Sequence, residues 1–365
     1  MPATPATSFP VVPHPLPASA ESRAAIVANP VFGKSFSDHM ARATWREGEG
    51  WTDRRVEALA PLPIHPAAIV IQYAQQVFEG MKAYKWADGS IRLFRPDRNA
   101  ARLAASARRM ALPELSEEDL IASLTSLVTA DAAWVPDQVG WSLYLRPTIF
   151  GTEPSLLITP SNEVEYVVTA GPANGSLFGG TAGVSIWVSM DYRRATKGGT
   201  GQAKTSGNYA ASMLASKEAY ANGCGQVLFL DAETGRYVEE LGGMNLMVVN
   251  ADGSVMTPRL SGTILPGVTR DSLLQIFRDQ GREVVERDIH ISEIVDGLTS
   301  GAVTELFACG TAAVVSPVGK LVSSDFDITV GDGMVGPVTT AARDALIGIQ
   351  YGLADDVHGW MLRII

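Results

Sequence analysis

The chain has 365 residues, of which 46% are hydrophobic and 19% are charged, and its formal net charge is −10. This composition is typical of a globular protein, and the length fits two domains better than one. No apolar run reaches the roughly 18 residues of a membrane-spanning helix. The basic residues are scattered, which argues against a nucleic-acid-binding surface and favours small-molecule chemistry.

The two cysteines, Cys224 and Cys309, are too few for a disulfide framework and show no metal-ligand spacing, so no metal site is predicted. Residues 1–22 are rich in Pro, Ala and Ser and lack the basic and apolar regions of a secretory signal. We therefore expect a flexible tail over 1–22 and a cytoplasmic location.

The first half of the chain alternates strand and helix signals. Apolar runs predict strands at 68–71, 91–94 and 164–168, and helical periodicity covers 99–110 and 116–128. Ser116 and Asp119 resemble a capping box at the start of the second helix. These elements predict an α+β arrangement.

A cluster of Gly, Pro and Asn at 171–180 is the strongest interior break, so the domain junction is placed there. The predicted division is a small α+β domain at 23–172, an interdomain loop at 173–183 and a large domain at 184–365. In the large domain we expect strands at 184–190 and 226–230, a helix from Tyr209, a hairpin over 246–256 turning at Asp252-Gly253, and a final helix at about 337–350. This second half is sheet-rich, which makes the whole a mixed α/β fold.

The segment 196–209 is unusual because it combines several glycines with Lys197 and Lys204. Glycines allow close approach to a ligand, and a lysine among small residues can act as an amine nucleophile. One alternative is a phosphate-binding P-loop, because Gly198-x4-Ala203-Lys204-Thr205 departs from the Walker pattern at one position. A second alternative is an ordinary surface loop with a solvated lysine.

A third interpretation is a Schiff base between Lys204 and pyridoxal phosphate (PLP), which also needs a carboxylate, a phenol donor and an anion site. Tyr209 lies five residues further on, and Glu239 and Glu240 precede a Gly-Gly pair in an apolar setting, although a solvated acid at a strand end is the alternative there. The segment 265–271 leads into a helical pattern whose first amides bind anions. The turn at 309–313 offers a hydroxyl and further amides.

These segments together resemble the class IV aminotransferases, and specifically the branched-chain amino acid aminotransferases. The likeness runs in order from about Phe32 to the C-terminus, through Val31-Phe32-Gly33-Lys34, Gln76-Val77-Phe78-Glu79-Gly80-Met81-Lys82-Ala83, Leu93-Phe94-Arg95-Pro96, Leu143-Tyr144-Leu145-Arg146-Pro147, Gly207-Asn208-Tyr209, Glu240-Leu241-Gly242-Gly243-Met244-Asn245, Ile264-Leu265-Pro266-Gly267-Val268-Thr269-Arg270, Ala308-Cys309-Gly310-Thr311-Ala312 and Gly348-Ile349-Gln350-Tyr351-Gly352. The resemblance implies a two-domain, fold type IV PLP enzyme that is D-amino acid aminotransferase-like, with 184–365 as the PLP-binding domain.

The resemblance also implies the site residues. Lys204 carries PLP as a Schiff base, Glu240 pairs with the pyridine nitrogen and Tyr209 bonds the phenolate oxygen. The phosphate is held by Arg102, Val268, Thr269 and Thr311; spacing alone does not distinguish Arg102 from Arg95, Arg98 or Arg109. The substrate meets Phe32, Tyr73, Phe78, Tyr144, Arg146, Gly243, Thr311 and Ala312.

In the family, Tyr144 and Arg146 lie on a loop that reaches the other subunit's site, so a homodimer is implied. The implied reaction moves the amino group of L-leucine, L-isoleucine or L-valine to 2-oxoglutarate, through a ping-pong exchange in which Lys204 shuttles the proton. Within the family, the D-amino acid aminotransferases and aminodeoxychorismate lyases share the lysine and carboxylate but lack the Phe-Glu-Gly-Met-Lys and Leu-Tyr-Leu-Arg-Pro segments.

Three departures from the family pattern are visible. Met247 stands where an aromatic residue is usual, and Gly-Ser-Leu-Phe around Ser176 replaces Ala-Tyr-Phe of the interdomain loop. Ala313 and Ser316 replace the Cys-x-x-Cys of mammalian relatives, so no thiol switch is expected.

Overall fold

The computed structural model describes residues 8–175 and 182–365. By its internal contacts the chain forms two compact units, which are described separately. The first comprises residues up to 175 together with 203–206 and 349–365, and the second comprises the remainder. This division differs from the predicted one, which assigned all of 184–365 to a single domain. Within the described ranges, no helix is long and apolar enough to cross a membrane.

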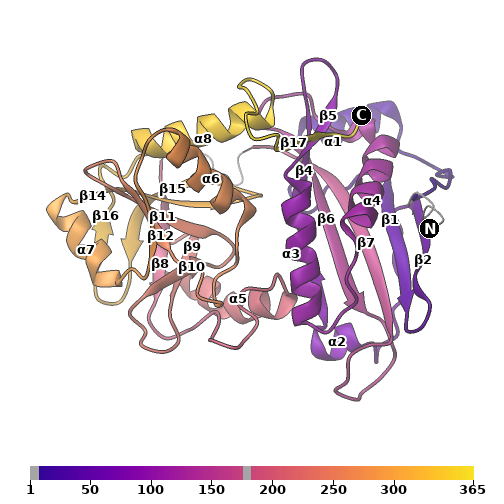
Figure 1. Cartoon of the computed structure of the whole chain (residues 1–365), viewed down its shortest axis with the longest axis horizontal. Coiled ribbons are helices and arrows are strands. Elements are labelled where there is room, and N and C mark those ends of the chain that lie inside the picture. The colour runs from indigo at the N-terminus through magenta and orange to yellow at the C-terminus, as the bar shows by residue number, and fades with distance from the viewer. Residues whose placement is uncertain (1–7, 176–181) are drawn as a thin grey trace, which may run out of the picture. The chain divides into compact units, whose positions relative to one another are not determined.

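The first unit is built on one mostly antiparallel sheet (Figure 1). Eight described strands run in the order β17-β5-β4-β6-β7-β1-β2, with β3 paired to β6. Their bounds are β1 His39–Arg46, β2 Gly50–Ala58, β3 Gln76–Phe78, β4 Met81–Lys85, β5 Ile91–Phe94, β6 Ser142–Gly151, β7 Glu163–Ala173 and β17 Met361–Arg363. The predicted strand at 91–94 is confirmed, and the one at 164–168 is the centre of the longer β7.

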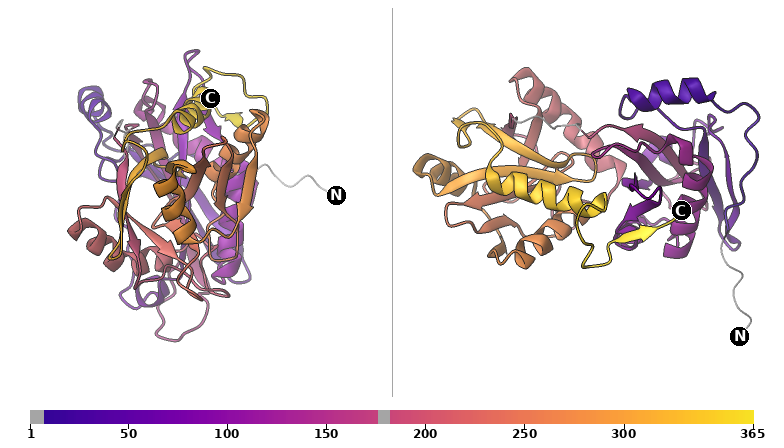
Figure 2. Two further views of the ribbon diagram at one scale, coloured as in Figure 1. Left: turned by 90° about the vertical axis from the view of Figure 1, so that its left-hand side faces the viewer. Right: turned by 90° about the horizontal axis from the view of Figure 1, so that it is seen from above.

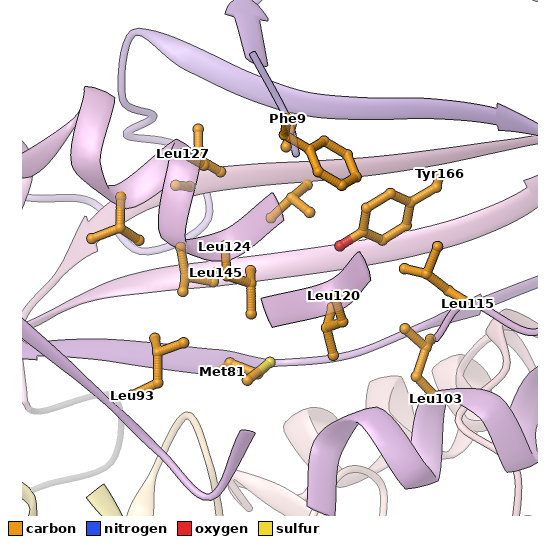
Figure 3. Close-up of a cluster of buried hydrophobic side chains, with 14 of the residues drawn as sticks. Phe9, Met81, Leu93, Leu103, Leu115, Leu120, Leu124, Leu127, Leu145 and Tyr166 are labelled. Carbon is orange, nitrogen blue, oxygen red and sulfur yellow. The ribbon is translucent and has the colours of Figure 1, made fainter. Parts of the chain in front are cut away.

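Helices α3 (Pro96–Arg109) and α4 (Glu117–Ala130) accompany this sheet. Leu120, Leu124 and Leu127 share one face of α4, because residues three and four positions apart lie above one another on a helix. Figure 3 shows them packed with Met81, Leu93, Leu145 and Tyr166 in one buried cluster. This core holds β4 and β6 rigidly, which matters because β6 carries predicted site residues on its other face.

The start of α4 follows the predicted cap only in part. Ser116 accepts a hydrogen bond from the backbone N–H of Asp119 at 3.0 Å. The Asp119 carboxylate accepts from the Ser116 hydroxyl and from Arg54, with Arg54 Nε 2.6 Å from Oδ1, instead of returning to the Ser116 amide. The acid is shorter than the usual Glu and is used for an ion pair.

The predicted flexible tail is wrong for its described part. Phe9 is 2% exposed and packs edge-on against Tyr166, and Val56 exchanges backbone hydrogen bonds with Pro10 and Val12. Helix α1 (Ala20–Ala28) begins inside the expected tail, with Ser19 as its N-cap. The Pro-rich composition therefore marks an extended segment that adds to the core.

The predicted strand at 68–71 is also wrong, because this segment begins the short helix α2 (Ile69–Tyr73). The helix ends at Ala74, whose φ of 53° is left-handed and whose N–H bonds the carbonyl of Val70. An apolar run of four residues fits a buried strand and a buried helical turn equally well.

The second unit is a nine-stranded sheet within the described residues. The order is β10-β9-β8-β15-β14-β11-β12-β13, with β16 paired to β15, and the strands are β8 Val184–Ser189, β9 Gln226–Leu230, β10 Val238–Leu241, β11 Asn245–Asn250, β12 Val255–Pro258, β13 Val284–Arg287, β14 Val303–Gly310, β15 Val314–Val322 and β16 Asp327–Thr329. β10 also pairs with β11, through Glu240 and Asn245, so six strands close into a ring. The predicted strands and the hairpin are confirmed, with Val248 opposite Met256 and Gly253 at a φ of 83°.

The helices of this part are α5 (Ser206–Ala221), α6 (Val268–Asp279), α7 (Ile291–Ser300) and α8 (Pro337–Gln350). Figure 2 shows α8, in yellow, running beside the strands of the second unit. Its first amides, from Val338 and Thr339, bond the buried Glu305 carboxylate at 2.9 and 2.8 Å. The helix predicted at 337–350 is confirmed, but β17 follows it and pairs with β5.

Candidate active site

The segment around Lys204 is hydrogen-bonded to the first unit. The Lys204 N–H donates to Ser106 Oγ of α3 at 2.9 Å, and its carbonyl accepts from the Phe78 N–H at 3.0 Å. Thr205 adds a bond from its hydroxyl to the Gln76 carbonyl at 2.7 Å. The lysine is therefore fixed at its backbone on both sides, as a side chain with a defined task requires.

The Lys204 amine lies near an aromatic ring and several charges. Its Nζ is 4.7 Å from the centre of the Phe78 ring. Desolvation is the main cause that lowers the Lys204 pKa to about 8; the positive charges of Arg102 and Arg146 lower it further, while Glu79 and Tyr144 oppose the shift. Much of the amine is thus neutral near pH 8 and available as a nucleophile. The alternative of a solvated surface lysine is wrong, because the side chain is only partly exposed and desolvated.

Arg102 is held by a carboxylate that the sequence analysis did not identify. Its Nε and Nη2 donate to Glu79 Oε1 and Oε2 at 2.7 and 2.8 Å, and Asn99 Nδ2 donates to the same carboxylate at 2.7 Å. Glu79 is fully buried, and its pKa is lowered because Arg102 outweighs the desolvation. Arg102 is thus selected from the four arginines of this stretch as the one locked in place.

Tyr144, Arg146 and Phe32 lie together in the first unit. Phe32 packs edge-on against Tyr144 at 5.0 Å between ring centres, and Arg146 Nη2 donates to the Tyr144 hydroxyl at 3.0 Å. The Arg146 guanidinium also lies over the Phe78 ring at 4.8 Å. A Cβ placed on Gly80 would come within 2.2 Å of the Tyr144 hydroxyl, so this close packing requires glycine there.

Tyr144 and Arg146 are not on a loop, and this part of the prediction is wrong. Both belong to β6, which pairs with β4 on one side and β7 on the other. Because side chains alternate along a strand, Leu143 and Leu145 enter the core while Tyr144 and Arg146 share the opposite face. Their charges act on the lysine of their own chain, as the Lys204 pKa shows.

Tyr73 is placed differently from the other aromatic residues of the predicted substrate pocket. It ends α2, is 41% exposed, and donates from its hydroxyl to the Leu156 carbonyl at 2.6 Å. The neighbouring loop exposes Leu156, Leu157 and Ile158 at 66%, 68% and 87%. Tyr73 is therefore part of an exposed apolar surface.

In the second unit, Glu240 is a buried carboxylate with three described donors. Oε1 lies 2.6 Å from Arg194 Nη2 and accepts from the Leu265 N–H at 2.8 Å, while Oε2 accepts from Asn245 Nδ2 at 3.1 Å. Arg194 and Glu240 are 5% and 4% exposed at their side chains. The alternative of a solvated acid at a strand end is wrong for Glu240.

Glu239 faces a different environment. It lines a cavity of about 370 Å³ in the second unit, together with Lys197, Asp231, Arg259 and Thr263, and burial raises its pKa. Neighbouring residues on a strand point to opposite faces, so only Glu240 is bonded to the segment before α6.

The predicted anion-binding segments also lie in the second unit. α6 starts at Val268 after Gly267, without a side chain capping its first turn, so backbone amides are the donors at this end. A Cβ on Gly267 would lie 2.1 Å from Asn245 Oδ1, which places this helix start beside the residue that bonds Glu240. Glycines likewise bring Gly243 close to Tyr209 and to the turn at Gly310, next to Thr311 and Ala312.

The structure thus brings the predicted residues together in two sets. One contains Lys204, Arg102, Phe78, Tyr144, Arg146 and Phe32, and the other contains Glu240, Tyr209, Gly243, Val268, Thr269, Thr311 and Ala312. The sequence analysis missed Glu79, Ser106, Arg194 and Asn245; Glu79 and Asn245 stand in the quoted motifs, while Arg194 carries no signal. The altered loop at Ser176 lies outside the described residues, and Met247 is buried opposite Phe307. Among the described residues, no group of three or more His, Cys, Asp or Glu could hold a metal ion.

Comparison with known proteins agrees with this arrangement. Residues 76–321 match the family model of class IV aminotransferases. The branched-chain-amino-acid aminotransferase of Mycolicibacterium smegmatis is 51% identical over 95% of this chain and 96% of its own, and the probable one of Streptomyces coelicolor is 49% identical over 95% and 96%.

Two solved structures show the same fold. The Escherichia coli branched-chain amino acid aminotransferase has a TM-score of 0.73 at 28% identity, covering 89% of this chain and 100% of its own. The branched-chain amino acid aminotransferase of T.th., solved with pyridoxamine 5'-phosphate, has a TM-score of 0.72 at 29% identity, covering 89% and 99%. The resemblance and the fold type IV prediction are confirmed: the chain belongs to the class IV aminotransferases, and within them to the branched-chain-amino-acid aminotransferases.

Proposed function

We propose that this protein transfers the amino group of L-leucine, L-isoleucine or L-valine to 2-oxoglutarate, reversibly, with PLP as its cofactor. The observation that carries the proposal is the amine of Lys204, held at its backbone on both sides and with its pKa lowered to about 8. The half-identical relative acts on the same substrate class by name, and a structural neighbour contains pyridoxamine 5'-phosphate.

The donor set fits PLP. The cofactor needs an amine, an acid for its ring nitrogen, a phenol donor and an anion site, and the chain offers a desolvated lysine, a buried carboxylate, a tyrosine and a helix start without a side-chain cap. When bound through its aldehyde, PLP supplies an electron sink for the substrate's Cα. In this proposal Lys204 holds PLP, Glu240 bonds the ring nitrogen and Tyr209 bonds the phenolate oxygen, while Arg102, Val268, Thr269 and Thr311 hold the phosphate.

Lys204 has a second task in this scheme. Once its amine is released by the incoming amino acid, Nζ takes the proton from Cα and returns it at the acceptor carbon. A pKa near 8 suits both directions, because an acid-base group works best when its pKa lies close to the working pH. Glu240 stays ionised and holds the ring-nitrogen proton, a charge effect that needs no movement during the reaction.

The substrate is bound by groups of two kinds. The amides of Thr311 and Ala312 take the α-carboxylate. The aliphatic side chain faces Phe32, Tyr73, Phe78, Tyr144 and Gly243. Arg146 meets the second carboxylate of glutamate or 2-oxoglutarate; its Nε is buried and has no hydrogen-bond partner among the described residues, so an anionic ligand would satisfy it.

The test is the absorbance spectrum of the purified protein before and after addition of L-leucine. We expect a visible band that moves to shorter wavelength with leucine, and its loss in Lys204→Ala. Lys217→Ala, an exposed lysine on α5, is the matched control and keeps both the band and the shift. A wild-type protein that stays colourless after incubation with PLP contradicts the proposal.

We further propose a homodimer in the cytoplasm. The exposed apolar run Leu156 to Ile158, joined to Tyr73, is a surface of the kind that a second copy covers. Two free, buried cysteines suit a reducing compartment, and burial raises the Cys309 pKa to about 12. Ile158→Glu should turn the dimer into a monomer in analytical ultracentrifugation, and an unchanged sedimentation coefficient would contradict this surface.

A further inference from the structure

Arg194 is the cation that meets the buried Glu240 carboxylate. Its Nη2 lies 2.6 Å from Glu240 Oε1 and also donates to the carbonyls of Gly201, at 3.0 Å, and Thr263. The two carbonyls orient the guanidinium from the glycine-rich loop and from the segment that leads into α6. The carboxylate is therefore met by a cation whose own position is fixed by backbone atoms.

A buried ion pair of this kind has a defined chemical effect. A nearby positive charge favours the ionised form of a carboxylate, and two further donors, Leu265 N–H and Asn245 Nδ2, favour it as well. A carboxylate that resists protonation leaves a shared proton on its partner. For a ring nitrogen bonded to Glu240, this means that the nitrogen keeps the proton that makes it an electron sink.

We propose that Arg194 is a positioning residue that fixes Glu240 and keeps it ionised, so that the proton stays on the cofactor's ring nitrogen. The inference rests on the proposed PLP chemistry and adds to it a residue outside the predicted site. Arg194 acts through Glu240. Lysine keeps the charge at this position but not the planar fork that holds two carbonyls and a carboxylate.

The experiment compares Arg194→Gln and Arg194→Lys holoenzymes with Arg193→Gln. Arg193 is a matched control because it is adjacent, half-buried and bonded to the carbonyls of Asp231, Met190 and Tyr192. We expect Arg194→Gln to lower kcat by about 10- to 100-fold, the range of a charge-assisted hydrogen bond, with the KM for L-leucine nearly unchanged. The pH at which the visible band changes should also shift, and Arg194→Lys should restore part of both effects.

A double-mutant cycle separates this role from a structural one. If Arg194 acts through Glu240, then Arg194→Gln has little further effect on kcat in a Glu240→Gln background. An equal loss of kcat in both backgrounds, or a visible band with the wild-type pH dependence in Arg194→Gln, overturns the inference. If Arg194→Gln does not fold, Arg194→Lys and the same cycle decide, because lysine retains the buried charge.

The outcomes also separate the inference from the function on which it rests. A wild-type protein without a visible band and without transamination overturns both. A normal wild-type enzyme whose Arg194 variants behave like Arg193→Gln overturns the inference alone.

Discussion

The Glu79 carboxylate and the Arg102 guanidinium form a two-point ion pair, with Oε1 2.7 Å from Nε and Oε2 2.8 Å from Nη2. Both side chains are buried, so neither charge can be solvated if the other is removed. Glu79→Gln should lower the free energy of unfolding by about 3–5 kcal/mol, the usual cost of breaking a buried pair. Urea denaturation measures it.

The control for this variant is Glu117→Gln, at an exposed position in the first turn of α4. It should change the free energy of unfolding by less than about 0.5 kcal/mol. Equal effects of the two substitutions would show that the pair is not what stabilises this part of the protein.

The Lys204 amine should set the pH dependence of cofactor uptake. Its pKa is lowered from 10.5 to about 8, chiefly by desolvation, and only the neutral amine adds to an aldehyde. The rate at which the apoprotein gains the visible band with PLP should therefore rise with pH and reach half its maximum near pH 8.

Lys82 provides the control, because burial also lowers its pKa to about 8. Lys82→Met should leave the midpoint of uptake unchanged, and a midpoint that moves in this variant would assign the titration to the wrong lysine. Stability follows the same sign, because the unfolded lysine binds its proton up to about pH 10.5 while the folded one releases it near pH 8. The apoprotein should thus become more stable between pH 8 and 10.5, and less so in Lys204→Met.

Gly80 should be intolerant of even a methyl group. A Cβ there would lie 2.2 Å from the Tyr144 hydroxyl, so Gly80→Ala must displace that ring. We expect a fall in kcat/KM for L-leucine of about tenfold or more, because a small misplacement near the reacting groups is costly.

Removing the clashing atom tests this cause. Tyr144→Phe deletes the hydroxyl, and in that background Gly80→Ala should cost much less, a non-additivity expected for residues in contact. Strictly additive losses would mean that the glycine is needed for another reason.

Phe9 should contribute to stability although it stands at the start of the chain. It is 2% exposed and packs on Tyr166, so Phe9→Ala should cost about 3–5 kcal/mol of unfolding free energy. Leu16→Ala, at a position 84% exposed, is the control and should be nearly neutral in the same denaturation series. A Phe9→Ala protein as stable as wild type would return this segment to the status of a flexible tail.

Much of the fold was predictable because its signals are local. The strands at 91–94 and 226–230, the hairpin at Gly253 and the helix at 337–350 each carry their own periodicity or turn residue. The failures have physical causes as well. Four apolar residues at 68–71 do not distinguish a strand from a helical turn, and Phe9 is buried by strands that come much later in the chain.

The site was predictable to the extent that it lies in sequence motifs. Lys204, Tyr209 and Glu240 were identified from their motifs, whereas Glu79 and Arg194 act through partners 23 and 46 positions away along the chain. No local pattern records such pairs. The placement of Tyr144 and Arg146 on β6 likewise depends on the pairing of three strands, which no single segment reveals.

The four residues 203–206 belong to the first unit, although the segments on both sides of them belong to the second. The backbone therefore passes between the units four times, and no single cut in the chain separates them. A gene fragment that starts near residue 184 would encode Lys204 without the α3 serine and the β3 amide that hold its backbone. Exchange of one half with a relative by recombination would consequently need matched junctions on both sides of the lysine.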